Sequence, residues 1–167
     1  MFRKGSHVQR MASFFVLSIE QYFGGKNYMN TAAKCIIVSK GGIAMFIQYN
    51  PNPIRHTDDC VIRAIAKVSD LPWEKAYMAL CLKGLEMYDL PNNNAVWGEY
   101  LRQKGYVREQ IENTCPNCYT VEDFCHEHPL GVYVLGTGTH AIAVIDGNFY
   151  DSYYSGDKVP MYAYRKE

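Results

Sequence analysis

The dipeptide Asp146–Gly147 constrains the fold of this chain more than any other short feature. It stands between "HAIAVI" and "NFYDSY", two runs rich in β-branched and aromatic residues. Asp-Gly between such runs is the strongest short-range signal for a two-residue β-hairpin. Two similar runs, "GVYVL" and "VPMYAY", lie on either side of this hairpin. The chain after Gly131 is therefore expected to form an antiparallel sheet.

Helical signals precede these strands. Asp58 or Asp59 can cap a helix from about Cys60 to Val68, whose apolar residues recur at helical spacing. Helices followed by strands indicate an α+β domain. Further helix starts are predicted at Pro72, at the asparagines 92–94 (with a stop at Gly105) and at Thr120, which forms a capping box with Asp123.

The 167 residues suit a single domain, and 48% hydrophobic residues suffice for a packed core. Residues 1–44 carry little periodicity, and a second methionine, Met45, follows them. We expect 1–44 to be an appended extension, disordered or upstream of the natural start, and 45–167 to be the domain. The alternative for the first segment is a helix over about 12–23 packed on the domain.

The charge balance bears on the partners. The chain has 17 lysines and arginines against 17 aspartates and glutamates, so it has no basic footprint for nucleic acid. The longest apolar run near the N-terminus, Phe14–Leu17, is far shorter than the roughly 18 residues that span a membrane. The expectation is a cytoplasmic protein that binds neither nucleic acid nor membrane. The oligomeric state cannot be predicted from these residues.

The hairpin register brings two polar residues together. With Asp146–Gly147 as the turn, Ala143 faces Tyr150 and Ile142 faces Asp151. His140 and Asp151 then become diagonal neighbours, with Cα atoms roughly 7–8 Å apart. Alternation would place them on one face of the sheet, together with Ile142, Val144 and Tyr153. A carboxylate on one imidazole nitrogen leaves the other nitrogen free to act as a base.

Cys60 is the candidate nucleophile for this base. It stands at the predicted start of a helix, where the partial positive charge favours thiolate, the nucleophilic form. Asp58 and Asp59 would oppose this effect unless they point away or act as the cap. His56, in the loop before the helix, is the alternative base.

These residues carry a resemblance. "DDCVIRA", followed downstream by "TGTHAIAVIDG" and "YDSYYSG", resembles the papain-like cysteine peptidases in the order cysteine, histidine, aspartate. The resemblance covers residues 46–167 and is nearest to small bacterial and phage-encoded members, including bacteriocin-leader peptidases. It implies a papain-like fold in which Cys60 is the nucleophile, His140 the general base and then acid, and Asp151 the orienting group. It implies no cofactor, and it implies that the protein works in a bacterium or a phage-infected cell.

The sequence departs from this family at the oxyanion hole. The family usually has a glutamine about six residues before the cysteine, and this chain has Ile54 there. Asn52 is the nearest amide that could substitute, with Gln48 further back, and the backbone N–H of Cys60 could supply the second donor. Loss of one oxyanion donor typically costs about 100–1,000-fold in rate.

Each residue taken singly also has a structural explanation. Cys60 could be a small core residue, His140 a histidine bonded to a carboxylate at a strand end, and Asp151 a cap for the turn at Ser152. Only their joint order and predicted common face favour catalysis.

A separate cluster, "CPNCYTVEDFCHEH", contains possible zinc ligands. Cys115 and Cys118 have the spacing of half a zinc knuckle, and Cys125 and His128 could complete a tetrahedral site. One C-x-x-C pair is weak evidence, and free thiols or a redox disulfide are the alternatives. No metal is expected.

The predicted function is therefore that of a cysteine peptidase or amidase acting on a peptide or protein through an acyl-enzyme. The alternatives are an acyltransferase of the transglutaminase type with the same triad, and a catalytically silent papain-like binding domain. The sequence does not specify the substrate. It also leaves open whether Trp97 and Tyr100 line a cleft or belong to the core.

Overall fold

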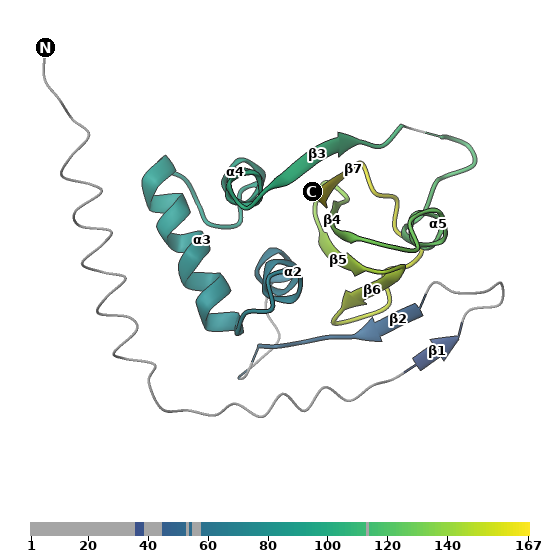
Figure 1. The fold of residues 1–167 in the computed structure, drawn as a ribbon, viewed down its shortest axis with the longest axis horizontal. Coiled ribbons are helices and arrows are strands. Elements are labelled where there is room, and N and C mark those ends of the chain that lie inside the picture. The colour runs from purple at the N-terminus through teal and green to yellow at the C-terminus, as the bar shows by residue number, and fades with distance from the viewer. Residues whose placement is uncertain (1–35, 39–44, 53, 55–57, 113) are drawn as a thin grey trace, which may run out of the picture. The chain divides into compact units, whose positions relative to one another are not determined.

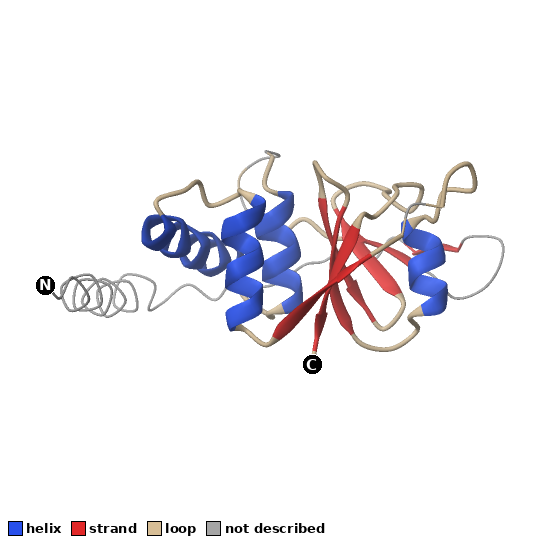
Figure 2. Ribbon diagram, turned by 90° about the horizontal axis from the view of Figure 1, so that it is seen from above, coloured by secondary structure: helices blue, strands red, loops and turns tan. Residues whose placement is uncertain are grey.

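A mixed β-sheet forms the centre of the molecule in the computed structural model, which describes residues 36–38, 45–52, 54, 58–112 and 114–167. In the described part of the chain, three helices cover one face of this sheet and one helix covers the other (Figures 1 and 2). The α+β class predicted from the sequence is confirmed. The helices are α2 (Cys60–Val68), α3 (Trp73–Met87), α4 (Asn94–Gln103) and α5 (Val121–Glu127).

The strands run in the order β1-β2-β6-β5-β4-β7-β3. Every neighbouring pair is antiparallel except β2 and β6, which are parallel. The expected antiparallel arrangement is thus correct for the C-terminal strands and wrong for the sheet as a whole. The bounds are β1 (Ile36–Val38), β2 (Met45–Gln48), β3 (Tyr106–Gln110), β4 (Val132–Gly136), β5 (Ala141–Ile145), β6 (Asn148–Asp151) and β7 (Tyr162–Lys166).

The helix starts follow their caps. The Asn93 side chain accepts a hydrogen bond from the backbone N–H of Ala95 at 2.9 Å, and Thr120 and Asp123 form the predicted capping box. Pro72 occupies the N-cap of α3 rather than its first turn. No helix in the described ranges is long and apolar enough to cross a lipid bilayer.

Alternation along the strands divides the core into two apolar clusters. Val134 and Ala143 face α2, whereas their neighbours Leu135 and Val144 pack with Phe124 of α5. The first cluster also contains buried residues of α3 and α4. α2 lies between the sheet and α3, and it contacts both β5 and β6 (Figure 1).

The predicted extension 1–44 falls mostly outside the described residues, as does the alternative helix over 12–23. Within it, β1 pairs with β2 through the partners Ile36–Ile47, Ile37–Phe46 and Val38–Met45. The sheet therefore includes a strand that the sequence assigned to the extension.

Candidate active site

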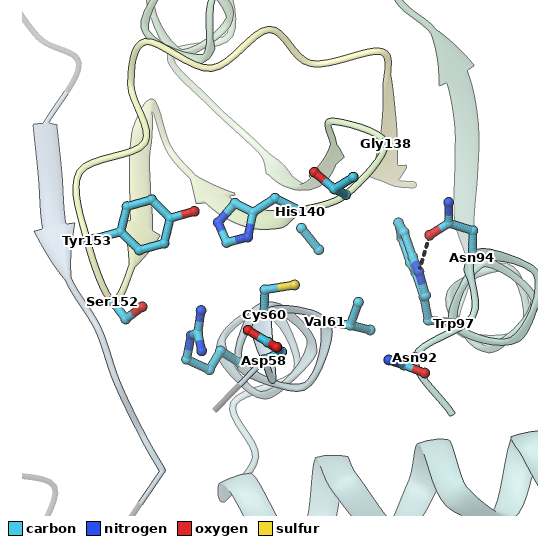
Figure 3. A pocket seen from close by; sticks show the side chains of 13 residues that line it. Asp58, Cys60, Val61, Asn92, Asn94, Trp97, Gly138, His140, Ser152 and Tyr153 are labelled. Atoms are coloured by element: carbon cyan, nitrogen blue, oxygen red, sulfur yellow. Dashed lines mark hydrogen bonds between the residues drawn. The ribbon is translucent and has the colours of Figure 1, made fainter. Parts of the chain in front are cut away.

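The structure brings the three residues predicted for catalysis to one place. Cys60 is the first residue of α2, His140 immediately precedes β5, and Asp151 is the last residue of β6. The Cys60 and His140 side chains point toward one another and line a cavity of about 540 Å³ (Figure 3). Cys60 is half-buried, whereas Asp151 is only 2% exposed.

The hairpin turn positions His140 and Asp151. Asp146 and Gly147 have φ values of 49° and 71°, as a turn with two left-handed residues requires, and the predicted pairing of Ala143 with Tyr150 is present. Nε2 of His140 lies 2.5 Å from Oδ2 of Asp151. The predicted hydrogen bond between the two side chains is confirmed.

The predicted common face requires a correction. Ile142 and Val144 pack in the cluster around α5, whereas His140 and Asp151 contact side chains of α2, on the other face of the sheet. Both polar residues lie beyond the last paired residues of the hairpin, Ala143 and Tyr150, so strict alternation no longer applies to them. Tyr153, also assigned to that face, does accompany His140, with ring centroids 5.2 Å apart.

Burial is the largest single influence on the pKa of the Cys60 thiol and opposes ionisation. The neighbouring His140 side chain and the backbone N–H of Ala141, together with the positive charges of His140 and Arg63, outweigh it, so the pKa of the Cys60 thiol lies below its ordinary value. The site therefore favours thiolate.

His140 responds in the opposite sense. Burial alone would lower its pKa, but the hydrogen bonds and negative charges of Asp151 and Cys60 raise the pKa of His140 to about 9. Because Nε2 is bonded to Asp151, Nδ1 is the nitrogen left for Cys60. The alternative base, His56, lies outside the described residues.

The two aspartates before Cys60 have different surroundings. Asp58 is exposed and lines the cavity. Asp59 is buried at the N-cap of α2 but makes no side-chain cap bond. Its carboxylate instead forms an ion pair with Arg63 and accepts hydrogen bonds from Trp73 Nε1 at 2.7 Å and Asn52 Nδ2 at 3.1 Å. The charge that would oppose thiolate formation is thereby compensated.

Arg63 is a component of the site that sequence reasoning missed. It is 7% exposed, and its Nη2 lies 3.4 Å from Oδ1 of Asp151. The same Oδ1 accepts the backbone N–H of Ser152 at 2.7 Å. The sequence feature that could have pointed to Arg63 is its place as a lone arginine inside the otherwise apolar stretch "CVIRAIA", three residues after Cys60.

The cavity has amide and aromatic walls. Asn92 and Asn94 line one side together with Trp97, whose Nε1 donates to Oδ1 of Asn94 at 3.0 Å (Figure 3). Trp97 therefore belongs both to the core, being 1% exposed, and to the cavity wall. Tyr100 belongs to the core cluster alone.

The two predicted oxyanion residues do not line this cavity. The Nδ2 of Asn52 donates to Asp59, and its Oδ1 accepts the backbone N–H of Ile54 at 3.1 Å. Gln48 is exposed on β2, where its backbone pairs with Asp151. Distance along the chain is the only sequence signal for both positions, whereas in the structure β2 runs alongside β6 and Asn52 is bonded to Asp59.

The possible zinc ligands are also separated. Cys125 is buried in the α5 cluster, and the His128 ring stacks on Phe124 with centroids 4.0 Å apart. Cys115 and Cys118 are exposed, with sulfur atoms 4.0 Å apart. Among the described residues, no three histidine, cysteine or acidic side chains form a group that could hold a metal ion.

The structure thus joins Cys60, His140 and Asp151 and leaves the other predicted site residues outside. Comparison of the chain with protein-family models, with curated proteins and with solved structures gave no match.

Proposed function

We propose that this protein is a cysteine peptidase or amidase of the papain-like type. The observation that carries this proposal is the continuous line from the Cys60 thiol through His140 to Asp151 at a cavity of about 540 Å³. A lowered thiol pKa beside a histidine whose pKa is raised to about 9 favours a thiolate–imidazolium pair. Such a pair is the reactive form of thiol hydrolases.

The proposed reaction has two halves, formation and hydrolysis of an acyl-enzyme, and Cys60 and His140 each act once in both. The Cys60 thiolate attacks the amide carbonyl carbon, and the C–N bond breaks as His140 delivers its proton to the leaving amine. A water molecule then gives a proton to His140 and attacks the thioester carbonyl, which breaks the C–S bond, releases the acid and regenerates the thiolate–imidazolium pair. Asp151 holds the imidazole and compensates its positive charge in both halves.

A peptide or protein segment is the proposed substrate. Asn92, Asn94 and Trp97 lie on one side of the Cys60–His140 pair and Tyr153 lies on the other, so an extended chain crossing the thiol would contact both walls (Figure 3). The Oδ1 of Asn94 is occupied by Trp97, which turns the amide nitrogen the other way as a donor at the wall.

A silent binding domain is the second candidate, and a specific observation favours it. The Asn52 amide expected at the oxyanion hole is bonded to Asp59 instead. Of the oxyanion donors expected from the sequence, the backbone N–H of Cys60 then remains, because Asn52 and Gln48 do not line the cavity. This candidate predicts a folded protein that binds peptides without turnover.

The decisive variant is Cys60→Ala. We expect it to lower hydrolysis of a fluorogenic peptide mixture by roughly 10⁴-fold or more, because the nucleophile is lost. The matched control is Cys81→Ala, which removes another half-buried thiol, on α3, and should leave the rate unchanged.

Hydrolysis that persisted in the Cys60→Ala protein would refute the mechanism. No turnover by the wild-type chain, together with a Cys60 that iodoacetamide alkylates only near the ordinary thiol pKa of about 8.5, would favour the binding domain. An increased rate of product release on addition of primary amines would identify an acyltransferase with the same triad.

A further inference from the structure

Arg63 lies buried between two carboxylates that come from different parts of the fold. One is Asp59, at the N-cap of its own helix, with which it forms an ion pair. The other is Asp151, at the end of β6, whose Oδ1 lies 3.4 Å from Nη2 of Arg63. The side-chain exposures are 8% for Arg63 and 2% for each aspartate, so all three groups are removed from bulk water.

The two oxygens of Asp151 have separate functions in this arrangement. Oδ2 faces Nε2 of His140 at 2.5 Å, while Oδ1 is approached by Arg63 and by the backbone N–H of Ser152. A carboxylate held through one oxygen cannot rotate without losing those contacts. The guanidinium fork is suited to this task because its donors have fixed directions, which an ammonium group lacks.

Burial makes a purely structural role for this arginine inefficient. Removing three charged groups from water costs several kcal/mol per ion, and well-packed apolar residues often stabilise a core as well or better. The other residues on the buried side of α2 are apolar (Val61, Ile62, Ala64, Ile65, Ala66 and Val68). A buried charge at this one position, three residues after Cys60, therefore calls for a functional explanation.

We propose that Arg63 is a positioning residue of the active site, which ties α2 to the end of β6 and holds the Asp151 carboxylate turned toward His140. This inference rests on the proposed function for its catalytic meaning. The positive charge of Arg63 favours the thiolate form of Cys60, in the same sense as the charge of His140. One side chain thus aligns the thiol-bearing helix with the carboxylate that orients the base.

The test is the Arg63→Gln variant, compared with Arg102→Gln as the matched control. Arg102 is also a helical arginine paired with a carboxylate, Glu99 at 2.7 Å, but its side chain is 69% exposed and it does not line the cavity. The first readout is the pH midpoint of Cys60 alkylation by iodoacetamide, followed by peptide mass spectrometry. The second is the low-field NMR signal of the His140 ring proton in the bond to Asp151.

We expect Arg63→Gln to raise the alkylation midpoint by at least about 0.5 pH unit, because a nearby positive charge is lost. The low-field proton signal should weaken or shift upfield, and Arg102→Gln should change neither readout. An Arg63→Gln protein that is folded, less stable, and unchanged in both readouts would show a merely structural role and overturn the proposal.

Should Arg63→Gln fail to fold because Asp59 loses its partner, Arg63→Lys supplies the answer. An ammonium group keeps the charge but reaches one carboxylate at a time, so it loosens the hold on Asp151. The pH midpoint of Cys60 alkylation should still rise, and the low-field NMR signal should still weaken. Wild-type values for both in the lysine variant would equally overturn the proposal. These outcomes are distinct from failure of the proposed function, in which Cys60 of the wild-type chain would itself react only at the ordinary thiol pKa.

Discussion

At the scale of single residues, the site depends on reciprocal effects between Cys60 and His140. Each group is partly buried, and burial by itself disfavours the charged form of both. The hydrogen bond and the opposite charges reverse this, so the thiol loses its proton more easily and the imidazole keeps its proton longer. Asp151 adds to the second effect by its bond to Nε2.

The raised pKa of His140 predicts the upper limb of the pH profile of peptide hydrolysis, the range in which the rate falls as the pH rises. A histidine with a folded pKa of about 9 stays protonated up to that pH, so kcat/KM for peptide hydrolysis should fall as pH rises through about 9. The same protonation stabilises the folded state fully below the unfolded pKa of about 6.5, and this stabilisation is lost as pH rises through the folded value. Kinetics from pH 5 to 10 would measure the limb.

Asp151→Asn is the variant that checks this assignment. It removes the negative charge that raises the pKa of His140, so the limb should move to lower pH. A limb near pH 6.5 in the wild-type protein, or one that stays in place in Asp151→Asn, would contradict the assignment.

At the scale of elements, the hairpin was the most predictable part of the site. The Asp146–Gly147 turn determines the register, and the register brings His140 and Asp151 together. The cap residues of α4 and α5 could be predicted equally well, because a cap side chain bonds to backbone groups only two or three residues away. The parallel pairing of β2 with β6 could not be predicted, because β2 is short, lies far from β6 in the chain and carries no local signal for its partner.

The turn predicts an ordering of two glycine variants. Gly147 has φ +71°, and a Cβ there would lie 3.2 Å from the carbonyl oxygen of Cys125 and 3.3 Å from Cα of Pro129. Gly105 has φ +82° with nothing within 4 Å of a Cβ. Both alanine variants should lose about 1–2 kcal/mol of unfolding free energy from left-handed strain, and Gly147→Ala should lose more. Urea unfolding measures both, and equal losses would contradict the contact with the α5 end.

At the scale of the whole molecule, the site depends on elements that meet from separate parts of the chain. α2 contributes Cys60 and Arg63, while β2 holds the end of β6 through the Tyr49 N–H, which donates to the Asp151 carbonyl at 2.6 Å. The sequence indicated the thiol, the base and the carboxylate. The lone arginine in an apolar helix marks Arg63 as unusual, but its role at the site follows only from the packing of α2 against β6, which gives that side chain a second carboxylate.

This arrangement makes the stability of the core separable from the chemistry of the site. Ile65 of α2 is 0% exposed, packs in the cluster between the sheet and α3, and does not line the cavity. Ile65→Ala should therefore lower the free energy of unfolding by about 2–5 kcal/mol through lost burial and a residual cavity. The exposed control Leu85→Ala, at a residue 70% exposed on α3, should change it by less than about 0.5 kcal/mol.

Below its unfolding transition, the Ile65→Ala protein should keep the low pH midpoint of Cys60 alkylation, because Cys60, His140 and Asp151 retain their contacts. If the midpoint rose in parallel with the loss of stability, the thiol would be activated by the general packing of α2 rather than by these three side chains.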